Sequence, residues 1–113
     1  MCNVYDQAYA LARAIRESDV YKQFKQAQSE VNQDSATKQM FDDFRQKQLD
    51  LQLRQLKGEE VAQEELDKIQ KLYEVVRLNP AINRLMEAEQ RFGLLMEDLN
   101  KIVTEPLKEL SEP

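Results

Sequence analysis

Apolar residues recur along the first third of the chain at alternating spacings of four and three residues. The first series is Val4, Ala8, Leu11 and Ile15, and the second is Val20, Phe24, Ala27 and Val31. Because an α-helix turns every 3.6 residues, each series falls on one side of a helix. The pattern predicts helices over about 4–17 and 19–32, and Ser18 can act as the N-cap of the second.

After a polar segment, Asp34 or Ser35 can cap a third helix over about 35–57, and Gly58 suits the left-handed position that ends a helix. The apolar residues of this helix lie on two nearly opposite sides. Met40, Phe44 and Leu51 share one side, and Leu49, Leu53 and Leu56 share the other. The third helix is therefore expected to be covered on both sides.

Two further helices are predicted after Gly58. A single apolar stripe indicates a helix over about 60–78, which would pack antiparallel to the third helix. Asn79 and Pro80 then mark a helix start, because asparagine caps and proline suits the first helical position, and this helix extends over about 80–104. Pro106 disfavours its continuation, so 105–113 is expected to be a short turn and a frayed tail.

These elements predict an all-α fold: a helical bundle of about five helices built around a long antiparallel helical hairpin plus a long C-terminal helix. The chain has 113 residues and no change of composition that would separate two domains, so 1–113 is expected to be a single helical domain. Its charged fraction of 33% and apolar fraction of 42% are typical of amphipathic helices and unlike a disordered tail.

Composition also bears on compartment and partners. The single cysteine, Cys2, cannot close an intrachain disulfide, which fits a reducing compartment and predicts a cytoplasmic protein. No apolar run approaches the ~20 residues that a membrane helix requires, so no membrane partner is expected. The net charge is −5, with seven Lys/Arg against thirteen Asp/Glu in 58–113, and no basic run occurs. Direct nucleic-acid binding is therefore disfavoured.

The residues that usually carry catalysis are sparse. The chain has no histidine, which removes the commonest general base and the commonest metal ligand. One cysteine cannot supply a zinc or iron–sulfur site by itself, so neither a metal nor a cofactor is expected. Paired carboxylates such as Glu64 and Glu65 are interpreted as solvated helix faces. We therefore expect no enzymatic activity and no catalytic residues.

The two-faced third helix indicates self-association, because an exposed seam of leucine and phenylalanine side chains favours packing against another protomer. We predict a homodimer, with an association face made of Phe41, Phe44, Leu49, Leu53 and Leu56. The alternative is a central helix covered on both sides within one chain. The first two helices could pack on their own chain or be swapped between protomers, and the sequence leaves both arrangements open.

Four segments also carry a family resemblance: 10–15 (ALARAI), 18–24 (SDVYKQF), 40–45 (MFDDFR), and 78–80 (LNP) followed by the long last helix. With this order of elements the chain resembles the YheA branch of the YlbF/YmcA family, small helical proteins of Gram-positive bacteria. The resemblance implies self-association and, in the better-known relatives, a hetero-complex that affects competence, sporulation, biofilm formation and RNA processing. That complex is associated with iron–sulfur clusters held by cysteines, whereas this chain has only Cys2.

Two functional hypotheses follow. The leading one is a non-catalytic protein–protein interaction or regulatory adaptor protein that self-associates through helical faces and presents a face or groove to a protein partner. The alternative is an accessory protein in RNA processing with weak direct nucleic-acid contact through Arg13, Arg16, Lys22 and Lys25, which are more simply a solubilising surface. Salt-sensitive RNA binding would favour the alternative.

Overall fold

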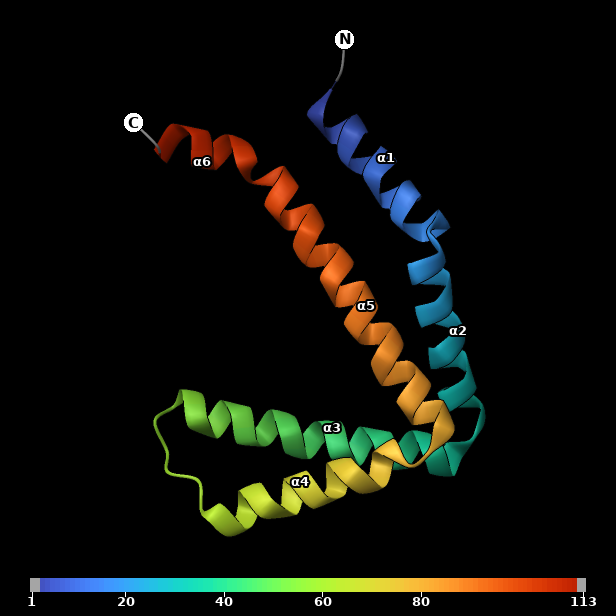
Figure 1. Ribbon diagram of the computed structural model, residues 1–113, viewed down its shortest axis with the longest axis vertical. Coiled ribbons are helices and arrows are strands. Elements are labelled where there is room, and N and C mark those ends of the chain that lie inside the picture. Colours follow the sequence, from blue (N-terminus) through green and yellow to red (C-terminus); the bar gives the residue numbers. More distant parts are fainter. Residues whose placement is uncertain (1–2, 112–113) are drawn as a thin grey trace. The chain divides into compact units, whose positions relative to one another are not determined.

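The computed structural model describes residues 3–111, and they form six α-helices (Figure 1). The helices are α1 (Val4–Glu17), α2 (Asp19–Gln33), α3 (Ser35–Leu56), α4 (Gln63–Arg77), α5 (Pro80–Val103) and α6 (Glu105–Ser111). No strand occurs between residues 3 and 111, and the predicted all-α class is confirmed. The predicted hairpin corresponds to α3 and α4, and the long C-terminal helix to α5.

The prediction of a frayed tail over 105–113 is wrong, because α6 occupies most of it; residues 112 and 113 lie outside the described part. Proline lacks an N–H group, so Pro106 cannot extend the hydrogen-bonding of α5. As the second residue of α6, however, Pro106 lies in a first turn, where no N–H donor is needed. The N–H groups of Leu107 and Lys108 donate to the carbonyl oxygen of Thr104, at 3.0 and 3.3 Å, and start the new helix.

The fourth helix begins at Gln63, three residues later than the sequence pattern indicates. The segment 59–62 contains no Ser, Thr, Asp or Asn, the residues that cap helices well. Ala62 occupies the N-cap position of α4 and provides no side-chain hydrogen bond. Glu64 and Glu65 lie in the first turn, where negative charge interacts favourably with the helix dipole. Electrostatics, rather than a capping side chain, therefore supports this helix start.

By internal contacts the chain divides into two compact units, whose boundaries both fall inside helices. The first unit contains Met1–Gln26 together with Met86–Pro113, and the second contains Ala27–Leu85. The single domain inferred from composition stays a prediction.

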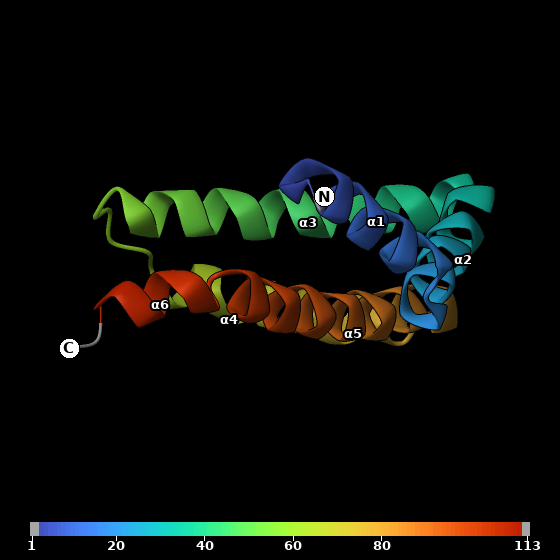
Figure 2. The ribbon, with the colours of Figure 1, turned by 90° about the horizontal axis from the view of Figure 1, so that it is seen from above.

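The second unit is built on the antiparallel pair α3 and α4, which lie side by side in both ribbon views (Figures 1 and 2). Gly58 follows α3 with φ at 79°, the left-handed conformation predicted for it. Its N–H donates to the carbonyl of Gln55, and the N–H of Glu59 donates to the carbonyl of Arg54, at 3.1 and 3.0 Å. These two bonds form a Schellman motif, which ends α3 and directs the chain toward α4.

A chain of polar side chains joins the starts of α3 and α5 within this unit. Asp34 caps α3 by accepting from the N–H of Ala36, and it also accepts from the hydroxyl of Thr37 at 2.7 Å. Asn79 caps α5 through the N–H groups of Ala81 and Ile82, and its amide donates to the Thr37 hydroxyl at 3.5 Å. Thr37 is buried, so both hydrogen bonds satisfy a hydroxyl that is shielded from water.

The core of the second unit is apolar and contains two buried phenylalanines, of which Phe44 is the more completely buried. Its buried apolar residues are Ala27, Val31, Phe41, Phe44, Val76, Ile82 and Leu85. The Phe44 ring lies against Tyr73 of α4, with ring centroids 5.9 Å apart and a tilted geometry that aromatic pairs favour. An exposed ion pair between Arg84 and Glu30, at 3.0 Å, links α5 to α2 at its edge.

In the first unit, α2 packs on α5 through aromatic side chains. Tyr21 and Phe24 of α2 contact Phe92 of α5, with ring centroids 6.1 and 5.3 Å away. The predicted cap is present, because the Ser18 hydroxyl oxygen accepts from the N–H of Tyr21 at 3.2 Å. By contrast, α1 has no buried residue although it is amphipathic. The first helix therefore contributes an apolar stripe that its own unit covers only in part, since Leu11 and Ile15 are half-buried and Val4 and Ala8 are exposed.

Candidate interaction surface

The five predicted association residues on α3 divide into two groups in the structure. Phe41 and Phe44 are buried. Leu49, Leu53 and Leu56 are exposed, with 50%, 46% and 84% of their surface accessible. We call these three the leucine row; they are four and three residues apart and so lie along one side of α3. The association role of all five residues stays a prediction, but only the leucine row is accessible in a single chain.

The two phenylalanines are held by aromatic and cationic neighbours. Phe44 contacts Tyr73, as described above, and the Arg45 guanidinium lies over the Phe41 ring, with its carbon atom 4.6 Å from the ring centroid. Such cation–π contacts strengthen as the cation loses water, and burial lowers the pKa of Arg45. The side of α3 that carries the phenylalanines is therefore covered by its own chain.

Two grooves flank the seam between α3 and α4, and Leu51 and Ile69 line both of them. The first groove has a volume of about 310 Å³ and is lined by Lys47, Asp50, Leu51, Arg54, Glu65, Lys68, Ile69 and Leu72. The second has a volume of about 490 Å³ and is lined by Phe44, Gln48, Leu51, Gln52, Gln55, Leu66, Ile69, Gln70 and Tyr73. A pair of helices cannot enclose its own seam, so both sides remain open. The first groove has charged residues in its lining and is called the charged groove. The second has no charged residue in its lining and is called the uncharged groove.

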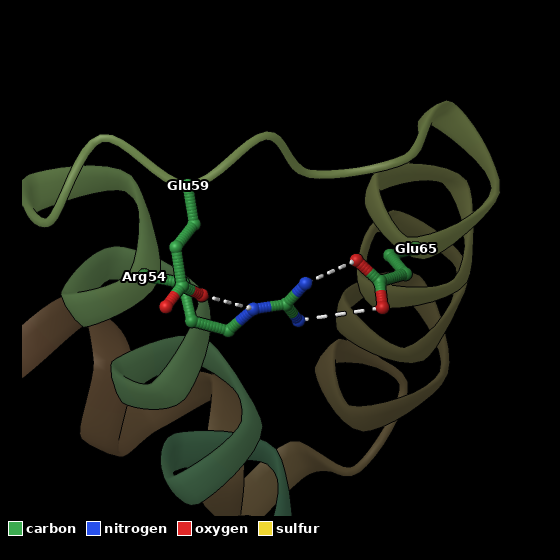
Figure 3. A network of polar contacts seen from close by, with 3 residues as sticks. All are labelled: Arg54, Glu59 and Glu65. Carbon is green, nitrogen blue, oxygen red and sulfur yellow. Dashed lines mark hydrogen bonds and ion pairs between the residues drawn. The ribbon is translucent and has the colours of Figure 1, made fainter.

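Arg54 holds the end of the hairpin together (Figure 3). Its guanidinium donates two hydrogen bonds to the Glu65 carboxylate, at 3.3 and 3.0 Å, and its Nε lies 3.4 Å from Glu59 in the connecting segment. Bidentate arginine–carboxylate pairs are among the stronger ion pairs because two bonds form in one plane. The three side chains, called the Arg54 clamp here, connect α3, the turn and α4.

The hydrogen bonds from Arg54 lower the pKa of Glu65 from its ordinary value of 4.5. A carboxylate with a depressed folded-state pKa stabilises the fold above pH 4.5, and this contribution is lost as the pH falls through the depressed value. We therefore expect Glu65→Gln to have a lower melting temperature than the wild type at pH 7. The difference should shrink as the pH is lowered below 4.5, in thermal unfolding followed by circular dichroism.

Glu64→Gln is the matched control, because Glu64 is an exposed carboxylate on the same turn of α4. It removes the same formal charge without breaking the Arg54 clamp. A melting-temperature difference between wild type and Glu65→Gln that is constant from pH 7 to pH 3 would contradict the assigned role of this ion pair.

The first unit also exposes apolar side chains on all three of the helices α1, α5 and α6. They are Val4, Tyr5 and Tyr9 on α1, Leu94, Met96, Ile102 and Val103 on α5, and Leu107 and Leu110 on α6. The four basic residues of the RNA-accessory hypothesis, Arg13, Arg16, Lys22 and Lys25, are exposed and distributed over α1 and α2. Their nucleic-acid contact stays a prediction.

Cys2 lies outside the described residues. Within residues 3–111, no group of three or more His, Cys, Asp or Glu side chains is placed to hold a metal ion. None of the helices in that range is both long and apolar enough to cross a membrane.

Comparison with known proteins identifies the family. The model of a family described as "Control of competence regulator ComK, YlbF/YmcA" matches residues 4–108. The chain belongs to the YlbF/YmcA family. A UPF0342 protein of Bacillus licheniformis is 47% identical over 108 residues, which are 96% of this chain and 92% of that protein. The UPF0342 protein YheA of Bacillus subtilis is 46% identical over 108 residues, with the same two coverages.

Two solved structures are similar to the chain along nearly its whole length. One, described as a protein of unknown function (DUF964) from Bacillus stearothermophilus, has a TM-score of 0.86 at 30% identity, and 96% of each chain is covered. The other, yheA from Bacillus subtilis, has a TM-score of 0.70 at 40% identity, with 96% of this chain and 99% of that chain covered. The YlbF/YmcA resemblance and its YheA branch, inferred from four short segments, are confirmed.

The Arg54 clamp and the uncharged groove were not found by sequence reasoning. Arg54 and Glu65 are eleven residues apart but lie on different helices, because the turn at Gly58 lies between them, so helical periodicity cannot relate them. The uncharged groove combines glutamines of both helices, and glutamine carries no periodic signal in a search for apolar stripes. A helical wheel that marks the charged positions of α3 would have shown a side without charge, on which these glutamines lie.

Proposed function

We propose that this YlbF/YmcA-family chain is a non-catalytic interaction protein that self-associates and acts as an adaptor or regulator for a protein partner. The observation that carries the proposal is the leucine row on α3. Single exposed leucines are ordinary on protein surfaces. Three of them at positions i, i+4 and i+7 form a continuous stripe, the pattern through which helices pack on one another.

The electrostatics of the second unit support a structural rather than a catalytic interpretation. Shifted pKa values often mark catalytic groups. Here the pKa of Arg54 is raised and that of Glu65 is lowered chiefly by the hydrogen bonds between them. Both groups are partly exposed and lie at the hairpin end. The ion pair between them accounts for both pKa shifts, and its role is to connect the two helices at the turn.

The regulatory part of the proposal comes from the family. Its description refers to control of a competence regulator. Helical faces are suited to that role, because an apolar stripe can pack into a groove or against another helix. The exposed apolar residues of the first unit offer a different protein a surface of this kind.

Leu53→Asp tests the self-association. It places a charge in the middle of the leucine row, where a packed interface would have to desolvate it. We expect wild type to be a dimer at micromolar concentration, and Leu53→Asp to be a monomer with unchanged helix content. Size-exclusion chromatography with light scattering measures the mass, and circular dichroism measures the helix content.

Leu78→Asp is the matched control, because Leu78 is an exposed leucine of the same unit that lies outside the leucine row. It should remain dimeric. A wild-type chain that is monomeric up to the highest soluble concentration would refute self-association. A dimer that persists in Leu53→Asp would place the association elsewhere.

A further inference from the structure

The C-terminal half of α3 segregates charge to one narrow side. Between Gln46 and Leu56 the charged residues are Lys47, Asp50 and Arg54, and at about 100° per residue they fall within an arc of about 60°. Every other residue of this segment is leucine or glutamine. Those residues extend over an arc of about 220°, which is far more than one neighbouring helix can cover.

The uncharged groove extends the leucine and glutamine surface of α3 across the seam to α4. Gln48, Gln52 and Gln55 form its α3 wall, and they lie between the seam and the leucine row on the same helix. All three glutamines are exposed. The six residues Gln48, Leu49, Gln52, Leu53, Gln55 and Leu56 are called the uncharged face below. In a chain with 33% charged residues, a continuous surface of this size without charge requires an explanation.

The charged groove lies on the other side of the seam, and its lining can be compared with that of the uncharged groove in the same hairpin. Its charged lining residues are Lys47, Asp50, Arg54, Glu65 and Lys68. Charged side chains interact well with water and keep that side solvated. The lining of the uncharged groove has no ionic group to keep it solvated, and none with which to attract a basic or acidic partner. This asymmetry between the two flanks selects the uncharged face as the covered one.

We infer that the uncharged face is covered by the same face of a second copy of this chain, related by a two-fold axis. The inference rests on the proposed self-association and specifies its geometry. In a two-fold interface each surface must be complementary to itself, so a charge near the axis would meet its own equivalent. Leucines pack on leucines, and a glutamine amide both donates and accepts, so two copies satisfy each other.

The two α3 helices run antiparallel across the axis. Gln52 lies in the middle of the uncharged face, with Leu49 one turn before it and Leu56 one turn after it. Antiparallel packing about this point brings Leu49 of one copy against Leu56 of the other, and places Gln52 close to its own equivalent. Two hairpins joined in this way form a four-helix arrangement, whose centre shields the half-exposed seam residue Leu51.

A charge-reversal pair at Gln52 tests this geometry in the full-length chain. In Gln52→Glu alone, and in Gln52→Lys alone, like charges meet across the axis. We expect the dimer dissociation constant of each variant to rise about tenfold or more. When the two variants are mixed in equal amounts, opposite charges meet, and a heterodimer with an affinity at or above that of wild type should form. Sedimentation equilibrium measures all three constants.

Gln28→Glu and Gln28→Lys are the matched controls, because Gln28 is an exposed glutamine of the same unit that lies on α2 and not on α3. Both should dimerise as wild type does, alone and mixed. Circular dichroism on every variant verifies that helix content is retained, so weaker association cannot be attributed to unfolding.

The outcomes separate this inference from the proposed function. A monomeric wild type refutes both. A wild-type dimer that tolerates both Gln52 charges leaves self-association intact and overturns the uncharged face as its interface. Two weakened variants whose mixture stays weak overturn the two-fold contact at Gln52. Weakening of each variant alone and recovery on mixing is the result that the inferred geometry requires.

Discussion

Phe44→Ala is expected to lower the free energy of unfolding by about 3–5 kcal/mol, the usual cost of truncating a buried phenylalanine. Phe44 is among the largest fully buried side chains, and its ring packs against Tyr73. The substitution loses the transfer free energy of the ring, the aromatic contact and the packing around the vacated volume. Since domains of this size are stable by about 5–15 kcal/mol, much of the total would be lost.

Urea unfolding at a fixed protein concentration measures this effect, because association would otherwise shift the midpoint. Leu78→Ala is the control, since Leu78 is an exposed leucine of the same unit, and it should change the free energy of unfolding by less than about 0.5 kcal/mol. A loss below about 1 kcal/mol for Phe44→Ala would mean that this ring is not part of a close-packed core.

The helix boundaries that could be predicted are those with a specific local cause. Gly58 adopts the one conformation for which glycine is preferred, and it ends α3 as expected. Asn79 and Ser18 cap the helices that follow them through side-chain hydrogen bonds. Each of these residues acts within a few positions of itself, so a reading of the local sequence is sufficient.

The boundaries that were wrong depended on weaker signals. Pro106 was interpreted as a helix breaker, but a proline in a first turn is compatible with a new helix, and α6 forms. The start of α4 was placed too early, because no capping residue marks it. In both cases the local sequence is compatible with more than one helix boundary.

The association residues show the limit of a helical wheel. The wheel identifies two apolar sides of α3 but contains no information about which side the rest of the chain covers. The five predicted residues therefore combined Phe41 and Phe44, which are buried, with the leucine row, which is exposed. Only the tertiary structure distinguishes the two groups, because it buries both phenylalanines and packs Phe44 against Tyr73. The family, by contrast, was accessible from sequence because it depends on residue identity along the whole chain.

Val76→Asp is expected to leave the chain largely unfolded at pH 7, whereas the same substitution at the preceding residue is tolerated. Val76 has none of its surface exposed, and Val75 has 56% of its surface exposed. A carboxylate at position 76 would have no water and no designed partner, and an unpaired buried charge costs more than about 4 kcal/mol. At position 75 the carboxylate remains hydrated, and the change should be within about 0.5 kcal/mol.

The pH dependence of Val76→Asp separates charge burial from a packing defect. Burial raises the pKa of an acid above its unfolded value, so the penalty is largest at high pH and decreases as the pH falls and the carboxyl group becomes protonated. Circular dichroism should therefore show helix content recovering between pH 7 and pH 4 for Val76→Asp. Val76→Asn, which has nearly the same shape but does not titrate, should show no such recovery. Equal, pH-independent unfolding of both variants would mean that shape and polarity, rather than charge, determine what position 76 accepts.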